Sequence, residues 1–529
     1  MQMRQLVSFF PNFTTCYKRD LYRCIFIIIC LLPVLIGRDF TPTNEFRYLS
    51  IADEALANGN FFAFTNHGIP YADKPPLYLW LVMAAKMIAG KHVMLLLSMF
   101  SVIPAFVLAG IMGHWTAEEY GRDKGRLAVW MIMGNIMMIV LMVTLRMDML
   151  MTMFIVLALR CFFKIYQNRG NVVFEKFLFP FYVFMAVFSK GPIGFIVPFA
   201  SIILFLILRH RIKDFKRYWG LQTFGVLLLL FSIWFLCVWY EGGADYLYNL
   251  TIHQTIGRGI NAFHHNRPFW FYAVHIFSVL FPLSLIVLFT VCKDIRHLRN
   301  MGDFRLLMAV VVISTFVVLS AISSKIDIYL LPLMPFIMTW AALLLHNVKY
   351  SRLSEVLAYL PFALLAAAAL LFPLVPPLFG VKYLDHAPFY MAASLLAVFS
   401  VIAVMKVRDN NLLQAVRLQT IGLYVTIFIA GFGVKHINPH IGLGKACHEA
   451  LVLREETGGK TPIYEWNIHR SEGMDVYLGD NAIKLNNAKE ASVVKGIIIT
   501  KRCNTDYFKG HKIINAGNKI VVDMSSNAI

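Results

Sequence analysis

Long apolar runs recur along this chain, separated by short connections that carry most of its charged residues. An apolar helix of about 20 residues is long enough to cross the hydrocarbon core of a bilayer. A further half-buried helix is expected at about 76–90. The chain is therefore predicted to be an all-α polytopic membrane protein with thirteen spans, at about 22–37, 93–114, 126–144, 149–167, 174–189, 192–208, 218–240, 270–291, 305–322, 328–346, 355–375, 388–406 and 415–433.

The composition agrees with this pattern, because 58% of the 529 residues are hydrophobic and only 15% are charged, whereas soluble proteins carry about 25% charged residues. The net charge of +19 would suit a nucleic-acid partner, but the basic segments fall on every second connection between spans. Lys and Arg accumulate on the cytoplasmic loops of membrane proteins. We therefore expect a cytoplasmic N-terminus, an outside C-terminus and no nucleic-acid partner.

Mixed polar sequence replaces the apolar runs from about residue 434 to the end of the chain. The sequence predicts a transmembrane domain over 1–433 and a small α/β domain outside the cytoplasm over 434–529. Cys447 and Cys503 both fall in the second domain and would either form a disulfide or remain thiols. The chain has no P-loop and no Rossmann fingerprint, so no nucleotide is expected. The predicted elements are a helix at 443–456 and strands at 461–466, 493–500, 511–517 and 519–524.

Two outside connections, 38–75 and 241–269, are long and rich in side chains capable of chemistry. In the first, EFRYLSIADEALANG predicts a short helix on the membrane surface that ends at Asn58-Gly59. A turn is expected at residues 66–68. The charges of this helix would either face water or form part of a site. Beside the end of the first span the helix would place Asn44, Glu45 and Arg47.

Ionisable residues also occur at the outer ends of later spans. Asp148 lies in the segment RMD between two spans, and Lys190 lies in the hairpin FSKGPIGF. An acid at membrane depth is costly unless it is paired or functional, so Asp148 would either pair structurally with Arg146 or act in a site. Lys190 could instead snorkel to lipid phosphates. The same rim carries Lys74, Arg258, His264, His265, Arg267 and Lys325.

The interiors of the predicted spans are nearly free of charge. Transporters and proton pumps hold ionisable groups near the membrane midplane, whereas this chain gathers them at one rim. That layout favours an enzyme whose substrate is anchored in the outer leaflet by a lipid phosphate. Cations would bind the phosphate, and a carboxylate would position or deprotonate an acceptor.

The residues NEFRYLSIADEALANGNFF and GIPYADKPPLYLW resemble the first outer loop of bacterial GT-C glycosyltransferases. The resemblance is to aminoarabinose (lipid A) transferases and to dolichyl-phosphate-mannose-protein mannosyltransferase-like enzymes. It continues through RMDML, FSKGPIGF, HHNRPFWFY and SSKIDIYLLPLMP, and so covers most of the membrane domain. A GT-C fold of about thirteen spans with an outside α/β domain is what the resemblance implies.

Roles for individual residues follow from the resemblance. It implies that Glu45 and Asp148 orient or activate the acceptor, with Asn44 in the same site. It also implies a divalent metal ion, Zn²⁺, Mg²⁺ or Mn²⁺, shared by Asp73 and His265. The residues implied for the donor phosphate are Lys74, Arg47, Tyr48, Tyr71, Arg258, Arg267, Lys325 and Tyr329.

The chain departs from the family pattern at Asn44, where the family has an aspartate. An amide has no useful basicity, so Asn44 cannot take a proton from a hydroxyl acceptor. Either Glu45 or Asp148 has inherited that role, or the acceptor needs no base, as an ionised phosphate would not. An inactive relative that has lost its catalytic acid is the third alternative.

The expected function is transfer of a sugar from a polyprenyl (undecaprenyl) phosphate carrier to lipid A phosphate, a protein or a glycan. The enzyme would lie in the bacterial inner membrane, surrounded by membrane lipids, and act as a monomer by analogy with the family. A flippase or transporter for lipid-linked sugars is the alternative. A scaffold built on the C-terminal domain is a third class.

Overall fold

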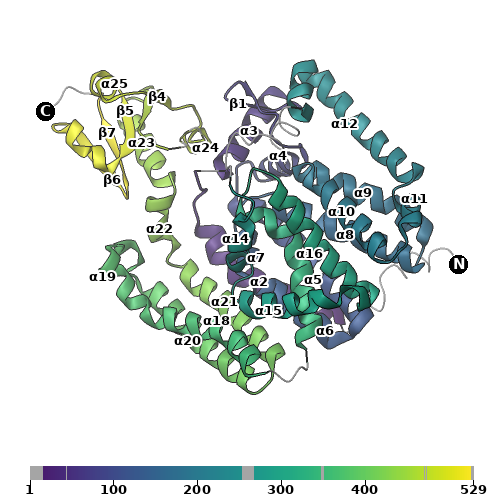
Figure 1. Ribbon diagram of the computed structural model, residues 1–529. Coiled ribbons are helices and arrows are strands. Elements are labelled where there is room, and N and C mark those ends of the chain that lie inside the picture. Colours follow the sequence, from purple (N-terminus) through teal and green to yellow (C-terminus); the bar gives the residue numbers. More distant parts are fainter. Residues whose placement is uncertain are drawn as a thin grey trace.

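The computed structural model describes residues 16–42, 44–252, 267–346, 351–469, 471 and 473–525. A bundle of long helices forms most of the molecule, and a small sheet lies at its C-terminal end (Figure 1). Within the described ranges, ten helical segments are long and apolar enough to cross a membrane. They comprise α2 (Cys16–Gly37), α5 (Met94–Tyr120), α8 (Asp148–Gln167), α9 (Val172–Lys190), α12 (Leu221–Tyr248), α16 (Asp303–Ala321), η4 (Asp327–Leu333) with α17 (Met334–Leu345), α18 (Arg352–Leu371) with its extension to Phe379, α20 (Ala387–Arg408) and α21 (Leu412–Gly431).

Three of the thirteen predicted spans do not form a single long helix. The run 126–144 folds as α6 (Arg122–Met133) and α7 (Ile136–Met142), bent by 62°. Gly134 follows the end of the first helix, and Asn135 caps the second, with its side-chain amide donating to Val279 O at 2.7 Å. The run 270–291 is divided into α14 (Phe271–Val279) and α15 (Ser284–Asp294). The run 192–208 forms only the 16-residue α10 (Ile193–Leu208).

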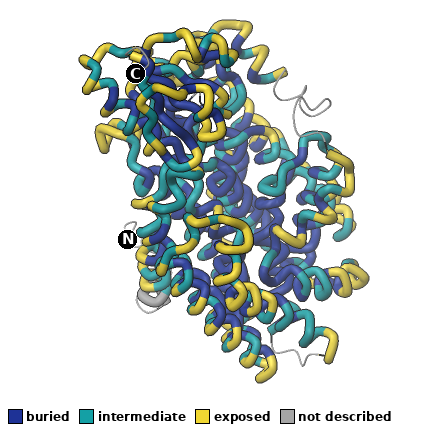
Figure 2. Tube along the Cα trace, turned by 90° about the vertical axis from the view of Figure 1, so that its left-hand side faces the viewer, coloured by how far each residue is buried: buried dark blue, intermediate teal, exposed yellow. Residues whose placement is uncertain are grey.

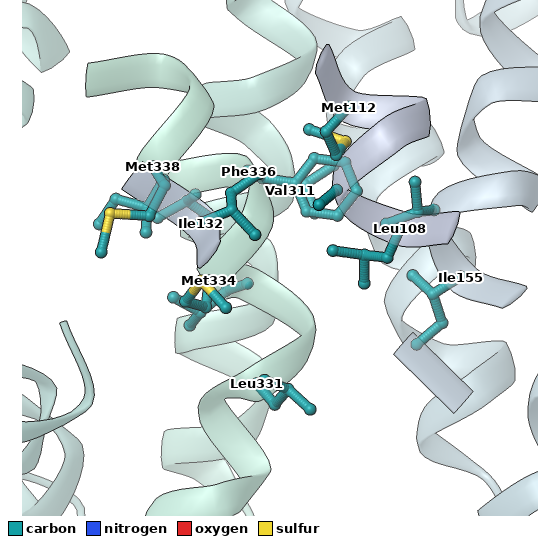
Figure 3. Close-up of a cluster of buried hydrophobic side chains, with 14 of the residues drawn as sticks. Leu108, Met112, Ile132, Ile155, Val311, Leu331, Met334, Phe336 and Met338 are labelled. Carbon is teal, nitrogen blue, oxygen red and sulfur yellow. The ribbon is translucent and has the colours of Figure 1, made fainter. Parts of the chain in front are cut away.

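The core of the bundle consists of aliphatic, methionine and aromatic side chains. In Figure 3, Leu108 and Met112 of α5, Ile132 of α6, Val311 of α16 and Phe336 of α17 belong to one such cluster. All five are completely or almost completely buried. Figure 2 shows that buried residues fill the middle of the bundle and the inside of the C-terminal domain. This packing fixes the ends of the helices, where the polar residues lie.

The C-terminal region begins with α22 (Val434–Ile441) and α23 (Gly444–Glu456). The four predicted strands are present as β3 (Ile463–Trp466), β5 (Ile497–Lys501), β6 (Lys512–Ala516) and β7 (Lys519–Asp523), and a fifth, β4 (Ile483–Leu485), was not predicted. The sheet order is β4-β3-β5-β7-β6, with β3 parallel to β4 and β5 and with β7 antiparallel to β5 and β6. Cys447 is buried, Cys503 is exposed and both are free thiols.

The C-terminal domain is docked on the first outer loop. Its short helix α24 (Asp475–Leu478) packs against α3 (Glu45–Asn58), and the two lie together in Figure 1. Ser50 Oγ donates to Asp475 Oδ2 at 2.7 Å, and the ring of Tyr477 meets Phe46 edge-on at 5.4 Å. This docking fixes α3 against the C-terminal domain. The division of the chain at residues 433 and 434 stays a proposal.

Candidate active site

The first outer loop folds as predicted around α3. Gly59 ends the helix in the left-handed conformation, as the Asn58-Gly59 stop predicts. A short hairpin, β1 (Thr65–Asn66) and β2 (Ile69–Pro70), follows, with its turn at His67 and Gly68. The chain then enters α4 (Leu77–Ala89), which is the expected half-buried helix.

Glu45 is buried, and both of its carboxylate oxygens accept hydrogen bonds from the protein. The guanidinium of Arg38 donates to both of its carboxylate oxygens, each at 2.8 Å. Thr41 N donates to one oxygen at 2.7 Å and Leu145 N to the other at 2.9 Å. Only 2% of Glu45 is exposed. The carboxylate therefore ties together the end of α2, the start of α3 and the segment between α7 and α8, and this geometry suits orientation better than proton transfer.

Asp148 lies between two cations at the start of α8. Lys190, the last residue of α9, donates to one carboxylate oxygen, and Arg146 Nε donates to the other at 3.2 Å. The ammonium of Lys190 also lies 4.5 Å from the ring centroid of Tyr329 in η4. Asp148 is 1% exposed. Two cations against one acid leave this cluster with a surplus positive charge.

Arg47 forms a second positive centre on α3. It donates to Asn44 Oδ1 at 2.8 Å, and its guanidinium lies over the ring of Tyr71 at 5.6 Å and that of Tyr48 at 5.9 Å. Burial raises the pKa of Tyr48, whereas the nearby guanidiniums of Arg146 and Arg47 oppose that rise. Tyr48 thus lies between the Arg47 centre and the Asp148 cluster, and the two positive centres are neighbours.

The segment before α4 carries the predicted lysine and meets Arg47 through Asp73. Asp73 interacts electrostatically with Arg47, and Lys74 Nζ donates to the backbone oxygen of Asp73 at 3.2 Å. Tyr246 of α12 holds the segment, since its hydroxyl donates to Tyr71 O at 2.7 Å. Six predicted site residues, Asn44, Arg47, Tyr48, Tyr71, Asp73 and Lys74, are thereby gathered around one loop.

Lys325 and Tyr329 lie on the segment that follows α16, and Arg267 lies on the segment before α14, joined to it by a hydrogen bond from its amide to Ser323 O. Lys325 is 3% exposed and donates to the backbone oxygens of Arg267 and Ile322. Its ammonium therefore fastens the entry to η4, which carries Tyr329. Arg267 itself has an exposed side chain. Arg258, His264 and His265 lie outside the described residues.

The pairing of Asp148 with Arg146, one of the two alternatives for that acid, is present, and Lys190 of the same rim is its second partner. Two residues of the site, Arg38 and Glu241, were not among those predicted, and Arg38 is the partner of Glu45. Glu241, near the end of α12, accepts from the amides of Phe61, Phe62 and Ala63 at 2.8–2.9 Å. The sequence signal for Glu241 is an acid at the outer end of a span, next to two glycines.

The implied metal pair cannot be assembled from the described residues, since His265 lies outside them. The described neighbours of Asp73 include Arg47, Lys74 and Tyr246. Within the ranges that the structure describes, no three or more His, Cys, Asp or Glu side chains are grouped for a metal ion.

Comparison with known structures decides the fold. ArnT from Cupriavidus metallidurans, crystallised bound to undecaprenyl phosphate, aligns with 95% of this chain and 97% of its own, with a TM-score of 0.74 and 15% identity. Its apo state aligns with a TM-score of 0.75. The chain has the GT-C fold.

Sequence relatives agree with this fold. An uncharacterized protein of Aquifex aeolicus is 24% identical over 67% of this chain and 74% of its own length. The undecaprenyl phosphate-alpha-4-amino-4-deoxy-L-arabinose arabinosyl transferase of Shewanella sediminis is 24% identical over 58% of this chain and 56% of its own. The chain thus spans about half the length of the arabinosyl transferases it matches. No family model matches the chain. Its relatives include aminoarabinose transferases, and the chain is a multi-pass bacterial inner-membrane protein.

Proposed function

We propose that this chain transfers a sugar from a polyprenyl-phosphate carrier to an envelope acceptor at the extracytoplasmic face of the inner membrane. One observation carries the proposal. Cations from three separate segments, Arg47, Arg146 and Lys190, lie around Tyr48 and Asp148 in a fold shared with a protein crystallised with undecaprenyl phosphate. Such a surplus of positive charge at a lipid boundary suits a lipid phosphate.

The donor phosphate would bind the positive side of the site. Arg47 of α3 and Lys74 of the segment before α4 are the proposed principal contacts, because both lie beside Asp73. Tyr48 and Tyr71 shape that side, since both lie against the Arg47 guanidinium. Lys325 and Tyr329 would support it from η4. Arg258 and Arg267 are proposed as weaker contacts.

The reaction breaks the bond between the anomeric carbon and the phosphate oxygen, and that oxygen leaves with the bonding electron pair. An acceptor oxygen forms the new bond to the same carbon. The leaving polyprenyl phosphate gains negative charge as the bond breaks, so cations already in place lower the barrier. Attack opposite the leaving group would invert the anomeric centre, which is proposed by analogy with the family.

Glu45 and Asp148 are proposed to hold the site in the geometry that orients the acceptor rather than to deprotonate it. Both carboxylates are buried and held by cations, and Asn44 is occupied by Arg47. An ionised phosphate acceptor needs no base, so a phosphorylated lipid such as lipid A suits this site better than a serine or sugar hydroxyl. A metal between Asp73 and His265 remains part of the sequence prediction, and no step here depends on it.

A reconstituted transfer assay tests the proposal against a lipid-linked sugar transporter. Purified protein in liposomes would receive a synthetic polyprenyl-phosphate sugar with lipid A, a peptide or a glycan as acceptor. We expect glycosylated lipid A and free polyprenyl phosphate, detected by mass spectrometry. Movement of intact donor across the bilayer without any transfer would overturn the proposal in favour of transport. Transfer to the peptide or glycan alone would overturn the phosphate acceptor.

The proposed topology has a cytoplasmic N-terminus and an extracytoplasmic C-terminus. It follows from the alternation of basic connections along the predicted spans. A single-cysteine labelling series on intact cells would test it, with an introduced cysteine at Lys91, an exposed lysine just after α4, expected to be accessible from outside. We also propose a monomer, which light scattering in detergent would check.

A further inference from the structure

A groove between α2, α5 and α6 lies at the opposite end of the bundle from the candidate active site. Figure 1 shows α3 and α4 at one end and α6 at the other. Helix α5 joins the two ends. Met94 at its start contacts Arg38, and its 27 residues span about 40 Å at the usual helical rise. The groove therefore belongs to the other face of the membrane and to no part of the proposed reaction.

The groove has an apolar slot and a basic end. Its cavity measures about 260 Å³, and the slot is lined by Ile27, Phe106 and Gly110. Arg23, Arg122 and Arg126 line the basic end. Basic and apolar side chains thus line different parts of one cavity. This arrangement is complementary to an amphiphile with an anionic head.

The arginines outnumber their acidic partners. Arg23 pairs with Asp20 at 2.8 Å, and Arg126 pairs with Asp123 at 3.0 Å. Arg122 is exposed and has no ion pair with any residue that the structure describes. A surplus cation at the edge of the slot provides a contact for one phosphate.

Gly110 keeps the slot open. A Cβ atom placed on it would meet no atom within 4 Å, whereas one on Gly113, a turn further along α5, would lie 2.3 Å from Val129 Cγ2. Gly113 therefore serves close packing of α5 on α6, but Gly110 faces empty space. Both α2 and α5 also expose apolar side chains, including Ile29 at 48% and Ile103 at 55%. The groove thus lies on the lipid-facing surface of the bundle.

From this separation of charge and hydrocarbon we infer that the groove binds an anionic phospholipid of the leaflet at the α6 end. One acyl chain lies along Phe106 and Gly110, and the phosphate contacts Arg122 and Arg126. The bound lipid covers the joint where α2 meets α5 and α6. Lipid binding in the groove requires no catalytic activity of the chain, so the test of this inference is independent of the proposed glycosyl transfer.

Native mass spectrometry of the full chain from detergent, titrated with phosphatidylglycerol or phosphatidylethanolamine, tests this site. We expect phosphatidylglycerol to bind more tightly. Arg122→Gln should weaken that binding about fivefold, the effect of one basic residue on an anionic lipid. Gly110→Leu should weaken the binding of both lipids about tenfold or more, because the leucine side chain fills the slot. Matched controls are Lys124→Gln, which lies on α6 outside the cavity, and Gly225→Leu, an equally open glycine on α12.

Equal binding of phosphatidylglycerol by the wild type and both groove variants would overturn the inference. So would displacement of the lipid by millimolar inorganic phosphate alone, since that result indicates an anion site without an acyl slot. Preferential displacement by polyprenyl phosphate would assign the groove to the carrier instead. A chain lacking residues 2–15 controls for the N-terminal segment. Stronger lipid binding by this shorter chain than by the full chain would mean that the segment occupies the groove, which would also overturn the inference.

Discussion

The guanidinium of Arg38 and the carboxylate of Glu45 form a two-point ion pair, with both N–O distances at 2.8 Å. Both side chains are largely buried, at 15% and 3% exposure. Two backbone amides complete the hydrogen bonds of the acid. The acid that most resembles a catalytic group in the sequence is therefore one that fastens three segments of the site.

This pair predicts that Glu45→Gln lowers stability as well as activity. Loss of the acid leaves Arg38 as a buried, uncompensated charge, a change that costs about 3–5 kcal/mol in buried pairs. Thermal unfolding in detergent would measure it. The double variant Arg38→Gln/Glu45→Gln should recover much of the lost stability, because neither charge remains. A stable Glu45→Gln protein that has lost only its turnover would show instead that Glu45 acts in the chemistry.

Asp148→Asn should lower kcat and leave the donor KM unchanged or lower. Removing the acid frees both Arg146 and Lys190 for the donor phosphate, so ground-state binding does not weaken. Misplacement of the acceptor is expected to reduce kcat about 100-fold. Initial rates against donor concentration separate the two parameters. A raised KM with normal kcat would contradict the orienting role.

Arg47→Ala and Lys74→Ala should each raise the donor KM about tenfold, since each removes one charge-assisted contact to the phosphate. Arg47→Lys should recover part of the loss, because it restores the charge but not the planar fork. Lys91→Ala is the matched control, an exposed lysine just after α4. Unchanged donor KM in both loop variants would mean that the phosphate binds elsewhere.

Glu241→Gln should loosen the loop that leads to Lys74. One carboxylate oxygen accepts three consecutive amides, and a neutral amide oxygen accepts them more weakly. Hydrogen exchange of residues 61–63 should become faster, with an increase in donor KM. Asp245→Asn, an exposed acid on the same helix, provides the comparison. Equal exchange in the Glu241 variant and the wild type would exclude this anchoring role.

The hairpin of β1 and β2 should be sensitive to acid. Burial acts to raise the pKa of Glu54, but hydrogen bonds from Thr65 and from the amides of Gly68 and His67 bring it below its ordinary value of 4.5. A lowered pKa in the folded state stabilises the hairpin above about pH 4.5, and this contribution is lost as the pH falls through the lowered value. Limited proteolysis of residues 65–70 at pH 6 and pH 4 would measure it. Glu54→Gln should be equally susceptible at both values.

The long spans and the α3 helix could be predicted because their signals are local. Ten of thirteen apolar runs are long helices, and α3 ends at its Asn-Gly stop. The bend at Asn135 could not be predicted, since a bent pair has the same apolar composition as one straight span. Strand β4 has three residues, too few to establish an alternating pattern.

The pairing of Asp148 with Arg146, two residues away, could be predicted as one alternative, but the more distant partners could not, because they depend on tertiary packing. Asp148 and Lys190 are 42 residues apart, and Glu45 reaches Leu145 across 100. The sequence indicated which side chains are unusual at one membrane rim. It could not distinguish an acid that is available for chemistry from one held by four hydrogen bonds.

Photocrosslinking tests most directly whether cations from distant segments form one phosphate site. A polyprenyl phosphate with a photoreactive group next to the phosphate would be irradiated with the purified chain and located by peptide mass spectrometry. We expect label in residues 71–74, 146–148 and 188–190 together, reduced in Arg47→Ala and unaffected in Lys91→Ala. Label confined to other parts of the chain, such as the arginines of α6 at the far end of the bundle, would contradict the account.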